Sequence, residues 1–286
     1  MHFPATNHTL NLRGKLMDLS VPKVMGILNV TPDSFYSSSR YMSEEGILTR
    51  AGQLVDEGVD ILDVGACSTR PGIELVCEEE ELLRLRLALH LIRRRWPNLP
   101  VSVDTFRAKI AEVVVTEFGV DLINDISGGT MDANMFQTIA KLKVPYILMH
   151  MQGEPTTMQE SPVYDDLISD ICRFFSEKVG QLRRLGVNDV VLDPGFGFGK
   201  TLDHNYELLR RLDDFKLFNL PVLVGLSRKS MIYKKLGVGP EQALNGTSIL
   251  HALALMGGAS ILRVHDVKEA RECVELYQNC KKGGIC

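Results

Sequence analysis

Residues 101–124 read VSVDTFRAKIAEVVVTEFGVDLIN, and this stretch contains the unit from which the whole fold is built. It holds two short apolar runs, residues 101–104 and 120–124, with a helix-length amphipathic segment between them. Short apolar runs are typical of buried parallel strands, which need a crossover connection that is usually a helix. The stretch therefore predicts one strand–helix–strand unit.

The same unit recurs along the chain. Short apolar runs occupy residues 24–29, 59–65, 101–104, 120–124, 144–150, 187–193, 222–227 and 260–265. Eight strand–helix units in about 250 residues predict an α/β fold, a (β/α)8 TIM barrel. We expect one catalytic domain over residues 1–286, with the barrel at about residues 24–280.

Three other segments complete the fold prediction. Alternating leucines around Arg13-Gly14-Lys15 predict a short N-terminal β-hairpin at about residues 9–20 that closes the bottom of the barrel. Long helices are predicted at residues 78–96 and 164–185, the second ended by Gly186. The arginines at the end of the first helix suit its dipole, so we interpret them as a solvated face rather than a nucleic-acid patch.

Composition excludes several classes of protein. The formal net charge is -4, which argues against a protein that mainly neutralises nucleic-acid phosphates. The six cysteines are scattered without metal-ligand spacing, which indicates reduced thiols. Neither a targeting segment nor an apolar span of membrane length is evident. We expect a cytoplasmic protein with no nucleic-acid or membrane partner.

Cationic side chains follow the second and the last strand. Arg70 lies between Thr69 and Pro71 in a non-helical turn, which would present its guanidinium as a fork for an oxyanion, although an ordinary surface arginine is the alternative. Arg263 and His265 are two residues apart, so they face the same side of the last strand. Since barrels often bind phosphate after strands seven and eight, these residues predict an anion site.

Carboxylate and amide side chains end three other strands. These strand-end residues are expected to meet at the mouth of the barrel, where few waters compete for their hydrogen bonds: Asp104, Asn124, Asp125 and Asp193. The alternative for Asp104 is to cap the helix that begins near Arg107. Residues 193–201, DPGFGFGKT, fit neither a P-loop nor a dinucleotide fingerprint and indicate a loop whose backbone approaches a ligand closely.

Five motifs in this order and spacing resemble bacterial dihydropteroate synthases. They are residues 29–35, 68–72, 193–198, 227–230 and 263–267, and the likeness extends from about residue 24 to about residue 278. The resemblance implies a homodimeric (β/α)8 barrel that uses Mg2+. It also implies condensation of 7,8-dihydropterin-6-ylmethyl diphosphate with 4-aminobenzoate in folate biosynthesis, release of diphosphate, and inhibition by sulfonamides.

The resemblance also implies roles for individual residues. Those implied to hold the pterin are Asp104, Asn124, Asp193 and Lys229. Those implied to hold the diphosphate are Asn29, Arg70, Arg263 and His265, with Asn29 also a magnesium contact. The implied aminobenzoate site comprises Phe35, Thr69, Pro71, Phe198 and Ser230. The implied catalytic residues are Asp104, Arg70, Lys229, Arg263 and His265.

The mechanism implied by the resemblance begins with loss of diphosphate, after which the arylamine attacks a pterin-methyl cation. Fixed cations suit the leaving group, and a carboxylate suits the electron-poor ring. Two positions depart from the family pattern: Ser37 stands where an aspartate is often found, and Ala66-Cys67 replaces a common Gly-Glu pair.

Two alternatives belong to other functional classes. A pterin-binding methyltransferase domain on the same barrel would need the pterin pocket but no cluster of diphosphate-binding cations. A non-catalytic barrel that binds pterin or a partner protein as a sensor would need none of the catalytic residues.

Overall fold

The computed structural model describes residues 9–31, 44–67, 76–153 and 162–282. Its main sheet has eight parallel strands in the order β8-β7-β6-β5-β4-β3-β10-β9. The strands are β3 (Lys23–Asn29), β4 (Ile61–Gly65), β5 (Val101–Asp104), β6 (Leu122–Asp125), β7 (Tyr146–Met149), β8 (Val190–Asp193), β9 (Leu223–Val224) and β10 (Ile261–Val264). All eight expected apolar runs contain a strand.

The sheet closes nearly completely into a barrel. Leu192 of β8 forms a parallel bridge with Val222, which precedes β9. The Leu192 N–H also donates to the Pro221 carbonyl at 2.9 Å, which links the two outermost strands. The predicted (β/α)8 barrel is therefore confirmed.

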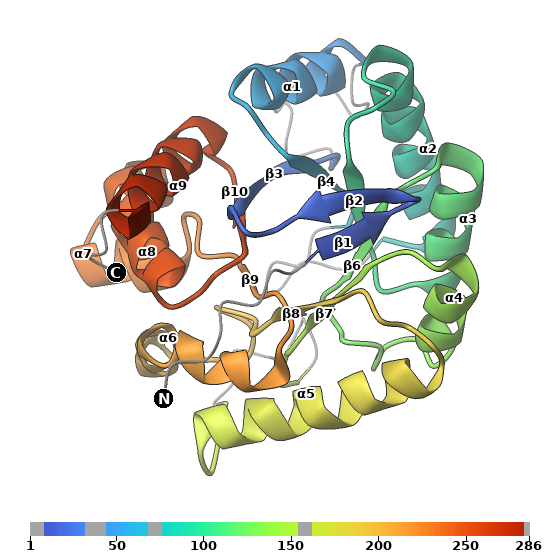
Figure 1. Cartoon of the computed structure of the whole chain (residues 1–286). Helices are drawn as coiled ribbons and strands as arrows, with labels where there is room; N and C mark the ends of the chain where they lie inside the picture. The colour runs from blue at the N-terminus through green and yellow to red at the C-terminus, as the bar shows by residue number, and fades with distance from the viewer. Residues whose placement is uncertain (1–8, 32–43, 68–75, 154–161, 283–286) are drawn as a thin grey trace.

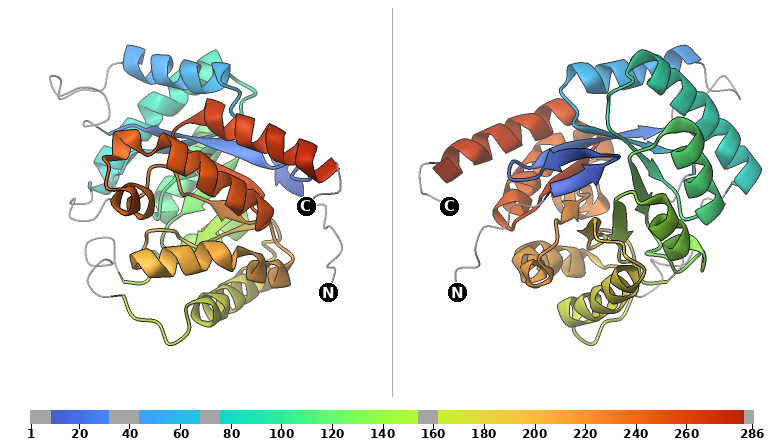
Figure 2. Two further views of the ribbon diagram at one scale, coloured as in Figure 1. Left: turned by 90° about the vertical axis from the view of Figure 1, so that its left-hand side faces the viewer. Right: turned by 45° about the vertical axis from the view of Figure 1, so that its right-hand side comes forward.

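Helices surround the sheet on the outside, as Figures 1 and 2 show. The α-helices are α1 (Glu44–Asp56), α2 (Glu78–Arg95), α3 (Ala108–Phe118), α4 (Met135–Leu142), α5 (Leu167–Arg184), α6 (Leu202–Arg210), α7 (Ser230–Leu236), α8 (Leu244–Met256) and α9 (Val267–Lys282). The 3-10 helices are η2 (Leu212–Phe218) and η3 (Pro240–Gln242). Within the described ranges, no helix is both long and apolar enough to span a membrane.

The two long helices that the sequence predicted are α2 and α5. Helix α2 matches its predicted range within one residue. Helix α5 begins at Leu167, three residues later than predicted, because the Asp166 side chain caps it by accepting from the Ser169 N–H at 2.7 Å. Gly186 has φ +82, so it ends the helical segment in the left-handed conformation expected of a glycine there.

Two arginines of α2 do not fit the predicted solvated face. Arg84 is 13% exposed and donates to the Ala66 carbonyl at 3.2 Å. The Arg93 guanidinium donates to the carbonyls of Leu99, Phe118 and Gly119 and to the Asp121 carboxylate, and its side chain is only 16% exposed. It therefore holds the loops that precede β5 and β6. The interpretation of these arginines as wholly solvated was wrong for Arg84 and Arg93, because loop carbonyls beside the helix needed donors.

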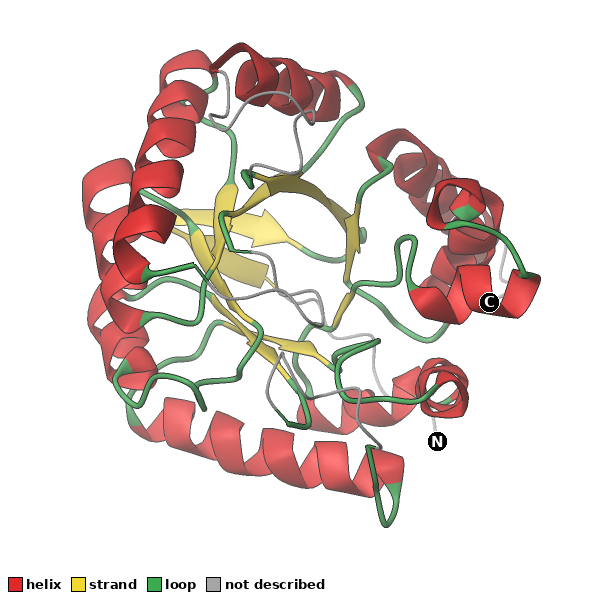
Figure 3. Cartoon of the chain, turned by 180° about the vertical axis from the view of Figure 1, so that it is seen from behind, coloured by secondary structure: helices red, strands yellow, loops and turns green. Residues whose placement is uncertain are grey.

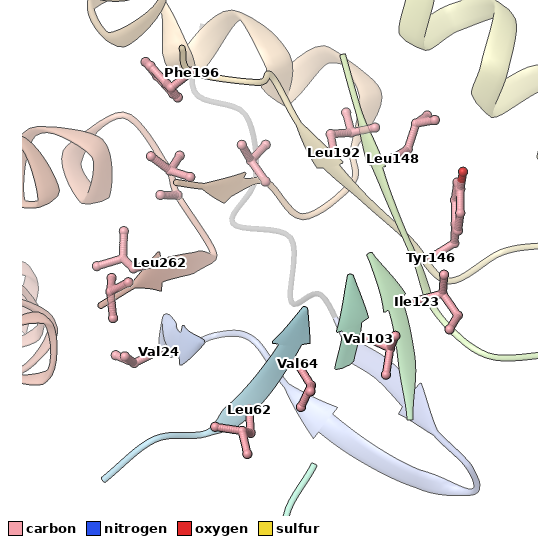
Figure 4. Close-up of a cluster of buried hydrophobic side chains, with 14 of the residues drawn as sticks. Val24, Leu62, Val64, Val103, Ile123, Tyr146, Leu148, Leu192, Phe196 and Leu262 are labelled. Atoms are coloured by element: carbon pink, nitrogen blue, oxygen red, sulfur yellow. The ribbon is translucent and has the colours of Figure 1, made fainter. Parts of the chain in front are cut away.

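The core lies between the barrel and its helices. Alternate side chains of each strand point outward against the helices, as expected for a period of two residues. Figure 4 draws part of this layer, including Val64, Val103, Ile123, Leu148 and Leu192, all completely or almost completely buried. The other alternate side chains face the barrel interior and provide the residues of the site.

The N-terminal hairpin closes the bottom of the barrel. Strands β1 (Thr9–Leu12) and β2 (Lys15–Asp18) pair antiparallel and lie across the barrel in Figure 1. Leu10, Leu12 and Leu19 pack on the inward residues near the amino ends of the barrel strands, which are Met25, Ile61, Leu122, Ile147, Val191, Leu223 and Ile261. This confirms the predicted hairpin, and the carboxyl ends of the strands lie at the opposite end of the barrel, seen in Figure 3.

Candidate active site

Four residues at the carboxyl ends of neighbouring strands lie in one layer. The register aligns Asn29 of β3 with Gly65 of β4, Gly65 with Asp104 of β5, and Asp104 with Asn124 of β6. Gly65 has no side chain, and a Cβ there would lie 3.4 Å from Asn29 Oδ1 and 3.5 Å from Asp104 Cβ. Asn29 and Asp104 therefore border the same space at the mouth of the barrel.

Arg263 of β10 joins this layer to a second carboxylate below it. Its Nε donates to Asp63 Oδ2 at 2.6 Å, and its Nη2 donates to Asp104 Oδ2 at 2.8 Å. Asn124 Nδ2 also donates to Asp63 Oδ2, at 3.1 Å. Asp63 is fully buried, and its Oδ1 has no hydrogen-bond partner among the described residues. An unpaired buried carboxylate oxygen is costly, so this atom is suited to accept from a bound ligand or water.

Asp63 is the residue of this network that the sequence reasoning missed. From the sequence, only the loop that follows its strand, where Arg70 lies, was considered. The alternation along β4 held the signal, because Ile61, Asp63 and Gly65 all face the interior while Leu62 and Val64 pack outward. A carboxylate on the inward face of a buried strand needs a partner, and inward-facing Arg263 was available.

Burial and neighbouring charges have opposite effects on the pKa values of Asp104 and Arg263. Burial raises the pKa of Asp104 to about 7, although the Arg263 guanidinium opposes the shift. Burial alone would lower the pKa of Arg263, but the Asp63 and Asp104 carboxylates hold it above its ordinary value. The guanidinium therefore stays charged, and its Nη1 remains without a hydrogen-bond partner among the described residues.

Asp193 and Lys229 lie on the other side of the mouth. Asp193 ends β8, is 6% exposed, and accepts from the Gly195 N–H at 2.8 Å. Burial raises the pKa of Asp193, and the nearby Lys229 ammonium opposes the shift. Lys229 Nζ donates to the Phe196 carbonyl and lies 4.5 Å from the centre of the Phe198 ring. Burial lowers the pKa of Lys229 to about 8.

A second lysine fixes the loop that carries Phe198. Lys200 is 2% exposed, and its Nζ lies 3.0 Å from His150 Nδ1 while donating to the Phe198 carbonyl at 3.1 Å. Burial lowers the pKa of both Lys200, to about 7, and His150. The contacts tie the loop after β8 to the end of β7.

Apolar side chains provide a wall beside these polar groups. Phe106, Ile126 and Met149 form a small buried cluster after β5, after β6 and at the end of β7. Cys67 and Phe198 pack against this cluster from the loops after β4 and β8. A flat heterocycle bound between the carboxylates would meet this apolar surface.

His265 follows β10 and is held by the loop after β9. Ser227 Oγ lies 3.0 Å from His265 Nδ1 and accepts from the His265 backbone N–H at 3.1 Å. The next residues form a bidentate ion pair, with Arg228 Nε and Nη2 donating to Asp266 at 2.8 and 2.7 Å. Ser230 begins α7 in the same loop region.

The alternative role considered for Asp104 is wrong. The residue before α3 is Arg107, whose side chain makes no cap, and the Ala108 N–H is satisfied by Asp132 Oδ2 at 2.8 Å. The prediction that Asp125 lies at the mouth is wrong. It is the neighbour of inward-facing Asn124, so its side chain faces the helices, where it accepts from Tyr146 Oη at 2.6 Å.

The predicted site residues fall into two groups. The structure brings together Asn29, Asp104, Asn124, Asp193, Phe198, Lys229, Ser230, Arg263 and His265 at the carboxyl ends of the strands. The remaining predicted residues, Phe35, Thr69, Arg70 and Pro71, lie outside the described residues, as does Ser37.

The arrangement suits a ligand that has a polar ring and an anionic group. Carboxylates such as Asp193 pair with a guanidine-like donor edge, whereas Arg263 and His265 offer donors to oxyanions. Within the described ranges, no three His, Cys, Asp or Glu side chains form a metal-binding group.

Comparison with known proteins gives a consistent result. The family model described as pterin binding enzyme matches residues 25–265. The dihydropteroate synthase of Escherichia coli (strain K12) is 44% identical over 268 residues, covering 93% of this chain and 94% of that protein. The dihydropteroate synthase of Haemophilus influenzae is 39% identical over 271 residues, covering 94% and 98% respectively.

Solved structures agree with the sequence relatives. The Yersinia pestis dihydropteroate synthase, solved with a sulfonamide drug, is 42% identical with a TM-score of 0.89, covering 96% of this chain and 100% of that one. The Xanthomonas albilineans dihydropteroate synthase, solved with 4-aminobenzoic acid, is 36% identical with a TM-score of 0.89, covering 96% and 99%.

Proposed function

The chain belongs to the dihydropteroate synthases, pterin-binding transferases of folate biosynthesis, and from that premise we propose how its strand-end residues divide the reaction. The reaction condenses 7,8-dihydropterin-6-ylmethyl diphosphate with 4-aminobenzoate. A C–O bond breaks, a C–N bond forms, and diphosphate leaves.

We propose that Asp104, Asn124, Asp193 and Lys229 hold the pterin. A pterin offers N–H donors along its N2–N3 edge, a carbonyl oxygen and ring nitrogens, which match a carboxylate, an ammonium and an amide. The buried position of Asp193 and the position of Lys229 beside Phe198 support this assignment.

Arg263 and His265, together with Arg70 from the loop after β4, are proposed to hold the diphosphate. Two of the Arg263 nitrogens bind Asp63 and Asp104, and its remaining Nη1 is a free charged donor among the described residues. The same guanidinium thus touches the pterin-binding carboxylate and can reach an anion. That continuity carries the proposal, because only one methylene group separates ring from diphosphate in the substrate.

Asn29 is proposed to contact Mg2+. Its Oδ1 faces the space above Gly65 and makes no hydrogen bond with any described residue. Mg2+ prefers oxygen ligands and commonly keeps its waters while binding one protein group and substrate phosphates, so the donor set fits. When bound, the ion would supply positive charge to the diphosphate oxygens.

The aminobenzoate site is proposed to include Phe198 and Ser230, with Phe35, Thr69 and Pro71 from the loops after β3 and β4. The exposed part of Phe198 and the start of α7 border the same mouth. We propose that sulfonamides, which mimic 4-aminobenzoate, compete at this position. The sulfonamide complex of the Yersinia pestis relative supports this.

For the chemical step, we propose that diphosphate leaves with the bonding electrons before the amine attacks. Arg263 and His265 would stabilise the charge that grows on the leaving oxygen, and the Asp104 carboxylate would stabilise the cationic pterin-methyl group. The neutral arylamine then donates its lone pair to carbon and loses a proton to solvent.

We further propose a cytoplasmic homodimer. Helix α8 exposes Ile249, Leu253 and Met256 by 54%, 47% and 62%, and their spacing of four and three residues places them on one face. A second copy of the chain would cover this stripe. The free thiols among the described cysteines support a reducing compartment.

A turnover assay tests the proposed function. Protein with Mg2+, the pterin diphosphate and 4-aminobenzoate should release diphosphate and form dihydropteroate in equal amounts. Absence of both products at saturating substrates would contradict the proposal. The methyltransferase alternative is not favoured, because a methyl donor would have no use for Arg263, His265 and Arg70 as anion ligands.

A further inference from the structure

The contacts of Ser227 determine which nitrogen of His265 carries a proton. Ser227 is 5% exposed, and within the described part of the chain its hydroxyl oxygen has two hydrogen-bond contacts, both to His265. The His265 backbone N–H donates to Oγ at 3.1 Å, so one lone pair of Oγ is occupied. The second contact, at 3.0 Å to Nδ1, can be made in either direction.

The number of hydrogens available shows which of the two groups, the Ser227 hydroxyl or His265 Nδ1, is the donor. A serine hydroxyl has one hydrogen to donate. If Nδ1–H donated to Oγ, that hydroxyl hydrogen would be buried without an acceptor, since Ser227 Oγ has no other partner among the described residues. If the hydroxyl donates to Nδ1, the hydroxyl hydrogen, Nδ1 and the His265 backbone N–H all have partners. The penalty for an unsatisfied buried donor favours the second arrangement by roughly tenfold to a hundredfold.

Because the His265 imidazole is neutral, its tautomer decides whether Nε2 is a hydrogen-bond donor or an acceptor. Burial lowers the pKa of His265 to about 4, and the Arg263, Arg228 and Arg50 guanidiniums reinforce the shift against the opposing Asp266 carboxylate. A neutral ring has one N–H, so its second nitrogen is either a donor or a lone pair. With Nδ1 accepting from Ser227, Nε2 carries the hydrogen, and the hydrogen bonds of His265 to described residues involve only its Nδ1, backbone N–H and carbonyl.

We propose that Ser227 is a positioning residue that fixes His265 in the Nε2–H tautomer and thereby presents a neutral N–H donor to the leaving diphosphate. The role at the diphosphate rests on the proposed function. In the opposite tautomer, the Nε2 lone pair would face the anion and repel it.

The backbone around His265 is also held by contacts that do not involve this hydroxyl. Arg50 Nη2 donates to the His265 carbonyl at 2.6 Å, and the Arg228–Asp266 pair joins the two loops. The side-chain contact of Ser227 is therefore separable from the loop connection. Arg228→Gln is a control that weakens the loop connection and keeps the hydroxyl.

Nitrogen NMR of the histidine ring tests the tautomer directly. With 15N-labelled full-length protein at pH 7, the His265 signals are assigned by their absence in His265→Gln. We expect a protonated Nε2 and an unprotonated Nδ1 in the unsubstituted protein and in Ser227→Thr and Arg228→Gln. Ser227→Ala should increase the Nδ1–H population at least several-fold. An unsubstituted protein with Nδ1 protonated, or an unchanged ratio in Ser227→Ala, would overturn the assignment.

A binding measurement on the same variants tests the role of the donor. Ser227→Ala should weaken binding of the pterin diphosphate about tenfold and leave binding of the phosphate-free pterin unchanged. Ser227→Thr keeps the hydroxyl and should bind the pterin diphosphate as tightly as the unsubstituted protein does. A tautomer shift without loss of diphosphate affinity would instead overturn the placement of His265 at the diphosphate. The NMR result thus tests the tautomer, and the binding result tests the position of His265 at the diphosphate, so failure of one can be told from failure of the other.

Discussion

Arg263 determines the charge balance of the site. It lies between two carboxylates that would otherwise repel each other, Asp63 at 2.6 Å and Asp104 at 2.8 Å. Its side chain is 21% exposed, whereas Asp63 is fully buried, so the pair is largely shielded from solvent. The sequence placed Arg263 only at the anion, and the structure adds its contacts with the carboxylates beside it.

Loss of this guanidinium should affect folding as well as binding. Arg263→Ala leaves two buried carboxylates without a cation, and we expect a loss of about 3 kcal/mol in the free energy of unfolding. Arg86→Ala is the matched control, because Arg86 pairs with Glu117 on the surface and both side chains are nearly half exposed. Denaturant unfolding should separate the two variants; equal stabilities would contradict a structural role for Arg263.

The pH dependence of kcat/KM should be bell-shaped. The Asp104 carboxylate is lost as pH falls through its raised pKa of about 7, and the Lys229 ammonium is lost as pH rises through its lowered pKa of about 8. Activity should therefore peak between these values. Lys229→Arg should move the upper limb to higher pH and leave the lower limb in place. A flat profile from pH 6 to pH 9 would refute the assignment of both groups.

Residues at strand ends could be predicted from the sequence, and residues deeper in the barrel could not. Asp104, Asn124 and Asp193 follow from the rule that barrel sites form at the carboxyl ends of strands. Asp63 lies one inward position below that level, and its contact with Arg263 spans 200 residues of sequence. Ser227 was likewise noted only as part of a motif, because its contact with the ring depends on how two loops approach each other.

Among the elements, the loop between β8 and α6 most directly shapes the site. It carries Phe198, and Lys200 fixes it to the end of β7. Gly195 has φ +72, and a Cβ there would overlap the His150 carbonyl oxygen. The sequence indicated close backbone approach to a ligand; the described contacts show that this glycine first approaches the neighbouring strand.

Gly195→Ala should therefore displace the loop. We expect a loss of about 2–3 kcal/mol in stability and a large rise in KM for the pterin diphosphate. Gly186→Ala is the matched control, because Gly186 has φ +82 but nothing within 4 Å of a Cβ. The control should lose about 1 kcal/mol through backbone strain alone and keep its KM. Unchanged KM in Gly195→Ala would show that the loop tolerates the shift.

At the scale of the whole molecule, a repeated apolar pattern was enough to predict the barrel. Eight runs at regular spacing fix the number of strands, and handedness rules leave few ways to arrange them. The closure of the sheet was not predictable at residue level, since β9 has only two residues and the bridge from Leu192 reaches Val222 before it. The contacts that a second copy would make are also not encoded in any local pattern.

The proposed dimer can be tested on the exposed stripe of α8. Leu253→Glu places a charge among apolar side chains that a partner would cover, so it should give monomers in sedimentation velocity. Leu83→Glu on α2 is the control, because Leu83 is 65% exposed and lies away from the stripe. Monomeric unsubstituted protein, or a dimer that survives Leu253→Glu, would count against this interface.

The division of the mouth into a ring-binding and an anion-binding part is tested most directly by calorimetry with two ligands, the pterin diphosphate and the phosphate-free pterin. Asp193→Asn should weaken both, because the amide cannot pair with the same donor edge. His265→Ala should weaken only the diphosphate ligand, by about tenfold to a hundredfold. Equal losses for both ligands in His265→Ala, or unchanged affinities in Asp193→Asn, would contradict that division.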